Sequence, residues 1–353
     1  MIKLSWLVSS SFLTLLITAP FYPDKDDLLY YRESSGARRA VASPDQWEVR
    51  RRHILENMQE VMGPLPGAER RVPLDVEVLE EKDFGSHVQR KITFAVEPGD
   101  RVPAYLLLPK GISGKAPAML CLHPTSEHGK AIVLDETHRP NRLYARELAE
   151  RGFVTLAPDY PGFGEYAEAR KWLYANGYVS TTMKAIFNHS RAIDLLSSLE
   201  EVDPERIGAI GHSLGGHNSL YLGVFEPRVK VMVTSCGFNT FRKYYGGNLT
   251  GWSHDGYMPR IATEYGKDPA QMPFDFTEVL GALAPRPVFI NAPIHDANFE
   301  VSGVQDCVRA AQPVYELLGA PDNLVAVYPE AEHDFPDAVR EQAYQFIEKQ
   351  LGH

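Results

Sequence analysis

The feature that most constrains the fold of this chain is a Gly-x-Ser-x-Gly pentapeptide at residues 211–215, placed between a short apolar run and a helix-like segment. A Cβ atom at Gly211 or Gly215 would collide with backbone where a strand and a helix close around such a turn. The first N–H groups of the following helix, at the positive end of its dipole, point to the place where an oxyanion would form. The pattern predicts a strained strand-to-helix turn that presents Ser213 as a nucleophile; the alternative is a serine in an ordinary glycine-rich turn.

Two later residues have the chemistry that a serine nucleophile needs. Asp296 follows an apolar run at residues 285–292, which is typical of a short buried strand after a proline-marked loop. His333 follows a second such run at residues 324–328 and precedes a predicted terminal helix. We expect His333 to take the proton of Ser213, and Asp296 to fix the tautomer of the imidazole and stabilise its charged form.

Three other acidic residues are weaker candidates for the acid. Asp306 falls within a helical pattern, which predicts a solvated position on a helix. Glu332 and Asp334 flank His333 too closely in the sequence to bond its Nδ1 easily. Asp296 is therefore the predicted acid.

The chain has 12 histidines, most of which are expected to be structural. His295 is a weaker candidate for the base, because no acid would then lie between it and Ser213. His212 and His217, beside the pentapeptide, are expected to pack or form hydrogen bonds locally. No group of histidine, cysteine and aspartate has the spacing of metal ligands, so we predict no metal and no cofactor.

The second donor of the oxyanion hole is predicted from the missing N–H group of Pro124. One donor is expected to be the N–H of Leu214, the residue after the nucleophile. The other comes from the loop after an apolar strand at residues 118–122, where His123 is followed by Pro124. Proline has no N–H group, so Thr125 is the nearest residue that can donate. The alternative for Thr125 is an ordinary loop residue.

Strand and helix signals alternate along most of the chain. This alternation predicts an α/β fold with a mostly parallel central sheet, helices on both faces and an N-terminal helical arm. The expected divisions are a signal peptide at residues 1–20, an N-terminal arm at 21–87, and a catalytic domain at 88–353 with an insertion at about 237–280.

Composition and charge exclude several classes of function. With 44% hydrophobic and 23% charged residues the chain is an ordinary globular one, and its net charge of −10 argues against nucleic-acid binding. One lysine, a short apolar stretch and a small residue before Pro20 resemble a secretory signal peptide, so we expect a secreted or periplasmic protein without a membrane span after processing. The three cysteines are expected to be buried free thiols.

Four motifs together resemble the α/β-hydrolase superfamily, in its secreted branch related to dienelactone hydrolases, acetyl xylan esterases and prolyl-oligopeptidase catalytic domains. They are Ala157-Pro158-Asp159-Tyr160-Pro161-Gly162-Phe163-Gly164-Glu165, Gly211-His212-Ser213-Leu214-Gly215-Gly216, Pro285-Arg286-Pro287 before Asp296, and Glu332-His333-Asp334-Phe335. The resemblance runs from about residue 88 to the C-terminus. Dienelactone hydrolases use a cysteine where this chain has Ser213. Acetyl xylan esterases typically carry His-Gly-Tyr where this chain has His123-Pro124-Thr125.

The predicted insertion is rich in aromatic residues, and in this fold an insertion often lies over the active site. Tyr244, Tyr245, Trp252 and Arg242 are the candidates for substrate binding, because aromatic rings stack on sugars and a cation grips a carboxylate. The alternative is that these residues pack a small core within the insertion.

The predicted function is that of an exported serine carboxylesterase that hydrolyses short acyl, acetyl-type esters, with a small molecule or a carbohydrate ester as substrate. One alternative is a serine peptidase of the prolyl-oligopeptidase type, although the N-terminal region is far too short for the propeller that gates such enzymes. Another is a non-catalytic carbohydrate-binding protein with the same fold, against which the complete set of motifs weighs.

Overall fold

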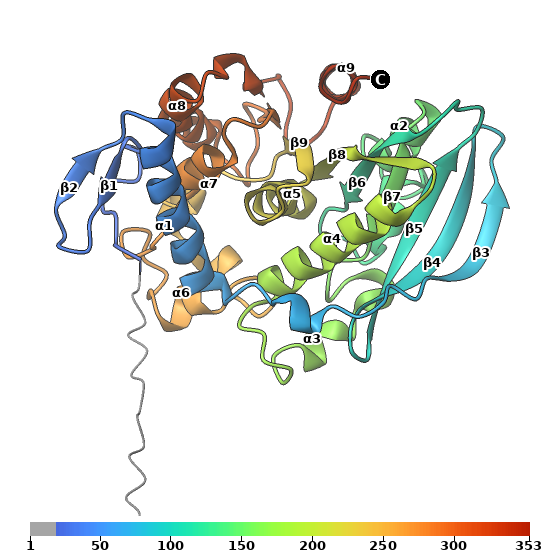
Figure 1. Ribbon diagram of the computed structural model, residues 1–353, viewed down its shortest axis with the longest axis horizontal. Helices are drawn as coiled ribbons and strands as arrows, with labels where there is room; N and C mark the ends of the chain where they lie inside the picture. The colour runs from blue at the N-terminus through green and yellow to red at the C-terminus, as the bar shows by residue number, and fades with distance from the viewer. Residues whose placement is uncertain (1–18) are drawn as a thin grey trace, which may run out of the picture.

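The computed structural model describes residues 19–353, and its centre is a twisted nine-stranded sheet (Figure 1). The predicted signal peptide falls on residues 1–20 and so lies, except for its last two residues, outside the described part of the chain. The strand order is β11-β10-β9-β8-β6-β7-β5-β4-β3. The bounds are β3 (Glu77–Asp83), β4 (His87–Glu97), β5 (Asp100–Pro109), β6 (Ala116–Leu122), β7 (Val154–Pro158), β8 (Val202–His212), β9 (Val229–Ser235), β10 (Val288–Asn291) and β11 (Leu324–Val327).

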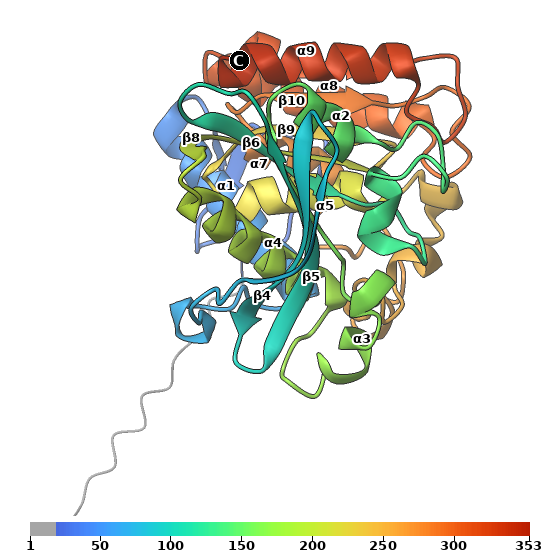
Figure 2. The ribbon, with the colours of Figure 1, turned by 90° about the vertical axis from the view of Figure 1, so that its right-hand side faces the viewer.

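The sheet is mostly parallel, as predicted. Strands β7, β6, β8, β9, β10 and β11 pair in parallel, so their carboxyl ends meet at one edge. Strands β3, β4 and β5 add an antiparallel extension next to β7. Figure 2 shows this extension at the near side of the molecule, with β4 and β5 as long neighbouring strands.

Helices cover both faces of the sheet because successive strand residues point to opposite sides. On β6, Ala118 and Leu120 face one apolar cluster, while Met119 and Cys121 face the other. The first cluster includes residues of α1, α4, α5, α7 and α8, and the second includes residues of α2 and α9, which Figure 1 shows on opposite sides of the sheet. The bounds are α1 (Pro44–Met62), α2 (Tyr144–Glu150), α3 (Ala169–Trp172), α4 (Thr181–Ser198), α5 (Leu214–Phe225), α6 (Arg260–Thr263), α7 (Phe276–Leu283), α8 (Val301–Leu317) and α9 (Asp337–Leu351).

The N-terminal arm consists of a short hairpin, β1 (Tyr30–Arg32) and β2 (Arg38–Ala40), followed by α1. Helix α1 packs against α7, where a fully buried ion pair joins Arg50 to Glu278. The predicted boundary at residue 88 is placed too late for the sheet. Strand β3 pairs with β4, so the antiparallel extension begins at Glu77, within the range assigned to the arm.

The segment between β9 and β10 matches the position of the predicted insertion. It contains the short helices η4 (Tyr244–Gly247), η5 (Leu249–Trp252) and α6, and it ends in α7. Its buried aromatic rings, including Phe238 and Phe241, pack with α7 in the main core.

Two further features of the described residues bear on the predictions. Cys121, Cys236 and Cys307 are buried and free, as expected. Between residues 19 and 353, no helix is both long enough and apolar enough to cross a membrane.

Candidate active site

The Gly-x-Ser-x-Gly segment forms the predicted strand-to-helix turn. Strand β8 ends at His212, α5 begins at Leu214, and Ser213 between them has φ 53° and ψ −115°. This positive φ is costly for a residue with a side chain and is maintained by its surroundings. A Cβ at Gly211 would lie 2.2 Å from the backbone of Gly215, and one at Gly215 would lie 1.9 Å from the carbonyl oxygen of Leu122. Glycine at these positions therefore allows the turn to close.

The predicted base and acid meet at the same edge of the sheet. Asp296 follows β10 and His333 follows β11, and the Nδ1 atom of His333 lies 2.9 Å from each carboxylate oxygen of Asp296. The side chain of Asp296 is 1% exposed, whereas that of His333 is 24% exposed. The carboxylate thus lies behind the imidazole and away from solvent, and the far side of the ring is accessible.

Ser213 and His333 line one pocket of about 680 Å³. Most of its other lining side chains are polar. Several of them come from residues 124–132 and 138–142, between β6 and α2. The lining residues used below are Thr125, Ser126, Glu127, His128, His138, Arg139, Arg142, His212 and Asn298. The size is within the range of small-molecule sites, and the polar lining favours a polar ligand.

The two predicted oxyanion donors also lie at this place. Leu214 is the first residue of α5, so its N–H has no carbonyl partner within the helix. Its side chain is buried against Tyr160. Thr125 is exposed and lines the pocket, directly after the buried residues His123 and Pro124.

His123 braces the turn that carries Thr125. Its Nε2 accepts a hydrogen bond from the N–H of Tyr160 at 2.9 Å, so the proton of the neutral ring is on Nδ1. Nδ1 therefore donates to the carbonyl oxygen of Pro124 at 2.7 Å. Burial lowers the pKa of His123, which keeps the ring neutral in this arrangement. This role of His123 was not predicted from the sequence, in which the residue is only part of the loop.

Tyr257, from the insertion, reaches the same loop. Its hydroxyl lies 3.4 Å from Oγ1 of Thr125, and its ring packs in a small cluster with Leu214. Burial raises the pKa of the Tyr257 hydroxyl, which therefore stays protonated at neutral pH.

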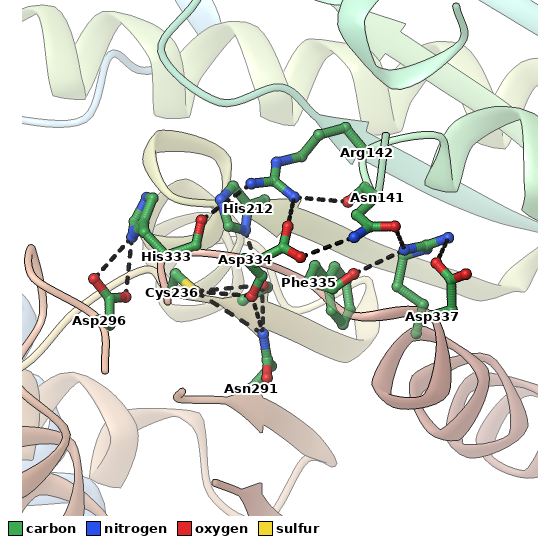
Figure 3. Close-up of polar contacts among 12 residues, drawn as sticks. Asn141, Arg142, His212, Cys236, Asn291, Asp296, His333, Asp334, Phe335 and Asp337 are labelled. Atoms are coloured by element: carbon green, nitrogen blue, oxygen red, sulfur yellow. Dashed lines mark hydrogen bonds and ion pairs between the residues drawn. The ribbon is translucent and has the colours of Figure 1, made fainter. Parts of the chain in front are cut away.

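Arg142 and Asn141 hold the loop that carries the base (Figure 3). Arg142, whose side chain is 3% exposed, donates to Oδ1 of Asp334 at 2.7 Å and to the carbonyl oxygen of His333 at 3.2 Å. Asn141 donates to the other oxygen of Asp334 at 2.8 Å. Burial acts to raise the pKa of Asp334, but the hydrogen bonds from Arg142 and Asn141 outweigh it, and the pKa is lowered.

The main chain of the same loop is bound from two more elements. Asn291, at the end of β10, donates to the carbonyl oxygen of Asp334 at 2.9 Å, and Arg340 of α9 donates to that of Phe335 at 2.8 Å. These contacts fix the loop over its length. Arg142 and Asn291 were not predicted from the sequence, because each meets the loop through a contact between distant parts of the chain.

The competing residues occupy other positions. Asp306 lies on α8, the predicted helix, but its side chain is 12% exposed rather than solvated and pairs with Lys243. His295 contacts Glu330 at 2.9 Å on the surface. His217 binds the carbonyl oxygen of Gly237 at 3.1 Å, as expected for a local contact.

His212 also makes a local contact but lines the pocket. Its Nδ1 lies 2.9 Å from Oγ of Ser235, and its ring centre lies 4.9 Å from that of His333. Burial, together with the nearby charges of Arg142 and His333, lowers the pKa of His212 well below its ordinary value. His212 is therefore a neutral neighbour of the base.

Within residues 19–353, one set of side chains has metal-ligand atoms close together. Ligand atoms of His212, Cys236 and His333 all lie within 4.8 Å of one another, a group that sequence spacing did not indicate. Two of these side chains already have hydrogen-bond partners, since Nδ1 of His333 contacts Asp296 and Nδ1 of His212 contacts Ser235. The Cys236 sulfur also donates to the carbonyl oxygen of Asp334 at 3.2 Å. The group does not fit a resident metal.

The four candidates for substrate binding are placed differently from one another. Trp252 is 3% exposed and packs in the core, and Arg242 is paired with Asp26 and Asp306 at 2.9 and 2.8 Å. The burial of Trp252 agrees with the alternative, a core within the insertion, whereas the Arg242 side chain is 42% exposed and substrate binding by it stays a prediction. Tyr244 is half-buried, with its ring centre 4.8 Å from that of Tyr245.

Tyr245 is the candidate nearest to the pocket. Its side chain is 56% exposed, and its hydroxyl donates to Oδ1 of Asn298 at 2.5 Å. Because Asn298 lines the pocket, Tyr245 lies at the rim.

A parallel sheet flanked by helices, with a serine turn after one strand and an Asp–His pair after two later strands, defines the α/β-hydrolase fold. Comparison with known proteins extends this assignment. Residues 68–244 match the family model of acetyl xylan esterase (AXE1), and residues 171–319 match that of glucuronyl esterase, fungi.

Individual proteins show the same relationships. The chain is 27% identical over 303 residues to "Putative hydrolase YtaP" of Bacillus subtilis (strain 168), covering 82% of this chain and 96% of that protein. It is 26% identical to 4-O-methyl-glucuronoyl methylesterase 1 of Wolfiporia cocos (strain MD-104), covering 51% and 48% of the two chains. A solved structure of a glucuronoyl esterase from Solibacter usitatus is similar in fold, with a TM-score of 0.74, 21% identity, and coverage of 94% of this chain and 99% of that one.

The protein belongs to the acetyl xylan esterase (AXE1) family. It is an enzyme that hydrolyses ester bonds, a carbohydrate esterase of the serine hydrolase type.

Proposed function

We propose that this esterase removes short acyl, acetyl-type groups from a carbohydrate, with Ser213 as nucleophile, His333 as base and Asp296 as the acid that orients it. The observation that carries the proposal is the contact of Asp296 with Nδ1 of His333, which leaves Nε2 of this ring to serve the pocket that Ser213 lines.

The reaction follows from this arrangement. His333 Nε2 takes the proton of Ser213 as Oγ attacks the ester carbonyl carbon, and the carbonyl oxygen becomes an oxyanion. The N–H groups of Leu214 and Thr125 donate to that oxyanion. His333 then gives its proton to the departing alcohol, which leaves an acyl group on Ser213. Water, deprotonated by His333, attacks the acyl group and releases the carboxylic acid and the free serine.

Family membership and the nature of the pocket support the acyl and alcohol preferences. The acetyl xylan esterase family is named for removal of acetyl groups from a polysaccharide. The pocket is lined mainly by polar side chains, which suits a sugar better than a long acyl chain. The family assignment also favours an esterase over the peptidase considered from the sequence.

The test is hydrolysis of 4-nitrophenyl acetate, butyrate and octanoate, followed by acetylated xylan, with the wild type, Ser213→Ala and Ser35→Ala. Ser35 is exposed on the β1–β2 turn and serves as the control. We expect the highest kcat/KM for acetate and its loss only in Ser213→Ala, with both variants folded by circular dichroism. Undiminished turnover by Ser213→Ala would refute the catalytic assignment, and a preference for octanoate would refute the acyl assignment.

A second candidate is hydrolysis of a uronate ester, in which the sugar supplies the acyl group. The observation in its favour is the match of residues 171–319 to the glucuronyl esterase model. Methyl glucuronate distinguishes the two, because its hydrolysis releases methanol and glucuronate rather than acetate. Release of methanol at a higher kcat/KM than that of acetate from acetylated xylan would select this second function.

We also propose that the N-terminal segment directs export. Its lysine and short apolar stretch are typical of a secretory signal. N-terminal sequencing of protein from a periplasmic or culture fraction tests this proposal, and an intact Met1 on protein found only in the cytoplasm would contradict it.

A further inference from the structure

Arg139 is a charged residue of the active-site pocket that the reaction described above does not use. It lies between η2 (Gly129–Val133) and α2, is exposed, and lines the pocket together with Ser213 and His333. Within residues 19–353 its guanidinium forms no ion pair and no hydrogen bond. Arg142, three residues later, is by contrast paired with Asp334.

The carboxylates near the pocket do not neutralise Arg139. Asp296 is engaged by His333, and Asp334 is engaged by Arg142. Glu127 also lines the pocket, but its side chain is 90% exposed and extends into solvent. The positive charge of Arg139 is therefore available to a ligand.

The loop that carries Arg139 is tied to the other side of the pocket mouth. The rings of His128 and His138 stack with centres 4.0 Å apart and an interplanar angle of 12°. Asp135, on the same loop, lies 3.9 Å from Nε2 of His138. These contacts restrain the segment that carries Arg139.

The charge of Arg139 acts at the catalytic end of the pocket. Arg139 lines the same pocket as His212, the residue immediately before Ser213, and, after burial, its charge is among the causes that lower the pKa of His212. An anionic group bound by Arg139 would therefore lie near the scissile ester.

A guanidinium group without a partner in the protein can bind an anionic group of a ligand. Its planar arrangement of N–H donors matches the oxygens of a carboxylate or a sulfate, to which it can form two parallel hydrogen bonds. The chain as a whole has a net charge of −10, which repels anions at long range. A local cation in the pocket offsets that repulsion for a ligand that carries negative charge.

We propose that Arg139 forms an anion subsite and that the natural substrate carries a carboxylate or sulfate group close to the ester that is cleaved. This inference rests on the proposed esterase function and specifies its substrate as an acidic carbohydrate, either uronate-containing or sulfated. The anionic group is free in the substrate and is distinct from the ester that reacts.

The test compares three acetate esters: 4-carboxyphenyl acetate, 4-sulfophenyl acetate and the neutral 4-carbamoylphenyl acetate, whose amide is not a second ester. For Arg139→Gln we expect kcat/KM to fall about tenfold on the esters with the preferred anion, mainly through KM, and less than about twofold on the neutral ester. In the wild type, 0.5 M NaCl should reduce the rate only on the charged esters. If kcat/KM of Arg139→Gln falls only on the carboxylate ester, the anionic group of the substrate is a uronate. If it falls only on the sulfonate ester, the group is a sulfate.

The control is Arg52→Gln, which makes the same charge change on α1, where the Arg52 side chain is 62% exposed. We expect this variant to retain the wild-type ratio of charged to neutral turnover. An Arg139→Gln enzyme that keeps this ratio, or that loses charged and neutral turnover equally, would overturn the proposal.

A binding measurement separates this inference from the proposed function. Galacturonate oligosaccharides and neutral xylo-oligosaccharides are titrated calorimetrically into Ser213→Ala and into Ser213→Ala/Arg139→Gln. Preferential binding of the acidic sugar that disappears with Arg139→Gln supports the subsite even if ester turnover fails. Equal binding by both proteins, with normal ester turnover by the wild type, rejects the uronate form of the subsite and leaves the esterase proposal standing; the sulfonate ester then decides the sulfate form.

Discussion

His333 and Asp296 face each other so that Nδ1 of the imidazole is 2.9 Å from both carboxylate oxygens. The carboxylate is held from behind, because its Oδ1 also accepts hydrogen bonds from the N–H groups of Asn298 at 2.8 Å and Phe299 at 3.1 Å. Asp296 is thus oriented before a substrate binds. An imidazole held in this way has its proton on Nδ1 and its lone pair on Nε2, the form that a base requires.

Replacing Asp296 with asparagine tests this orientation. The amide keeps the size of the side chain but can donate to Nδ1, which favours the wrong tautomer. We expect kcat for acetate esters to fall by roughly 10³- to 10⁴-fold, while KM changes little. Steady-state kinetics measures the effect, and an unchanged melting temperature shows that the fold is intact. A loss of less than tenfold would contradict the role given to Asp296.

Arg142 is a positioning residue, because it acts through the loop that carries His333. In Arg142→Gln we expect kcat to fall about 10- to 100-fold with less than about a threefold change in KM, since a small displacement of the base is costly. Arg142→Lys should recover part of the loss, because it keeps the charge beside Asp334 without the second donor to the His333 carbonyl. Equal losses in the two variants, or a change only in KM, would argue against this role.

The lowered pKa of Asp334 predicts a pH-dependent contribution to stability. A carboxyl whose pKa is lower in the folded state stabilises the protein above its unfolded pKa, and this contribution disappears as the pH falls through the folded pKa. Asp334→Asn should therefore reduce the free energy of unfolding by about 1–2 kcal/mol at pH 7, a modest value since the side chain is 35% exposed. Urea unfolding at pH 7 and pH 3 measures it, and the same loss at both values would contradict the prediction.

Two glycines of α5 are expected to differ in how much a substitution by alanine destabilises the protein. One is required by the turn at Ser213, and the other only packs against side chains. Gly215→Ala places a Cβ 1.9 Å from the Leu122 carbonyl oxygen, so we expect a loss of about 3 kcal/mol or more, together with loss of activity. At Gly223 the nearest atoms are the side chains of Leu283 and Met232 at 2.9 and 3.0 Å, which can move. Gly223→Ala should change stability by about 1 kcal/mol at most. Thermal unfolding of both variants tests the contrast, which fails if they are equally stable.

Trp252 and Tyr245 are expected to respond in opposite ways. Trp252→Ala removes a buried ring from the core and should cost about 3–5 kcal/mol in unfolding free energy. Tyr245→Ala removes an exposed ring at the pocket rim and should leave stability within about 0.5 kcal/mol while raising KM for carbohydrate esters. Denaturant unfolding and kinetics on acetylated xylan measure both. A stable Trp252→Ala enzyme with a raised KM would restore the original prediction of substrate binding.

Local patterns in the sequence were sufficient for the main elements of the sheet. The apolar runs at residues 285–292 and 324–328 contain β10 and β11, and the terminal helix predicted after His333 is α9. Strand β3 was assigned to the N-terminal arm, because its residues are all exposed and lack the alternation that marks a half-buried strand.

The sequence by itself determined the order of the three catalytic candidates along the chain and the strand that precedes each of them. Glycines around Ser213 specify a turn that depends only on adjacent residues, and Asp296 and His333 each follow a strand whose end lies at the same edge of the sheet. Their proximity follows from parallel pairing, which the alternation of strands and helices already implies.

Tertiary structure alone decided which polar side chains are engaged and which are free. Arg142 and Asp334 are 192 residues apart, and Arg242 and Asp26 are 216 apart, so no local pattern indicates that either pair meets. The same holds for Trp252, whose ring is buried by residues from other segments, and for Arg139, which has no ionic partner among residues 19–353 because neighbouring carboxylates bind elsewhere. Long-range packing sets the burial and the partners of each charge, and these decide whether a side chain supports the fold or meets the substrate.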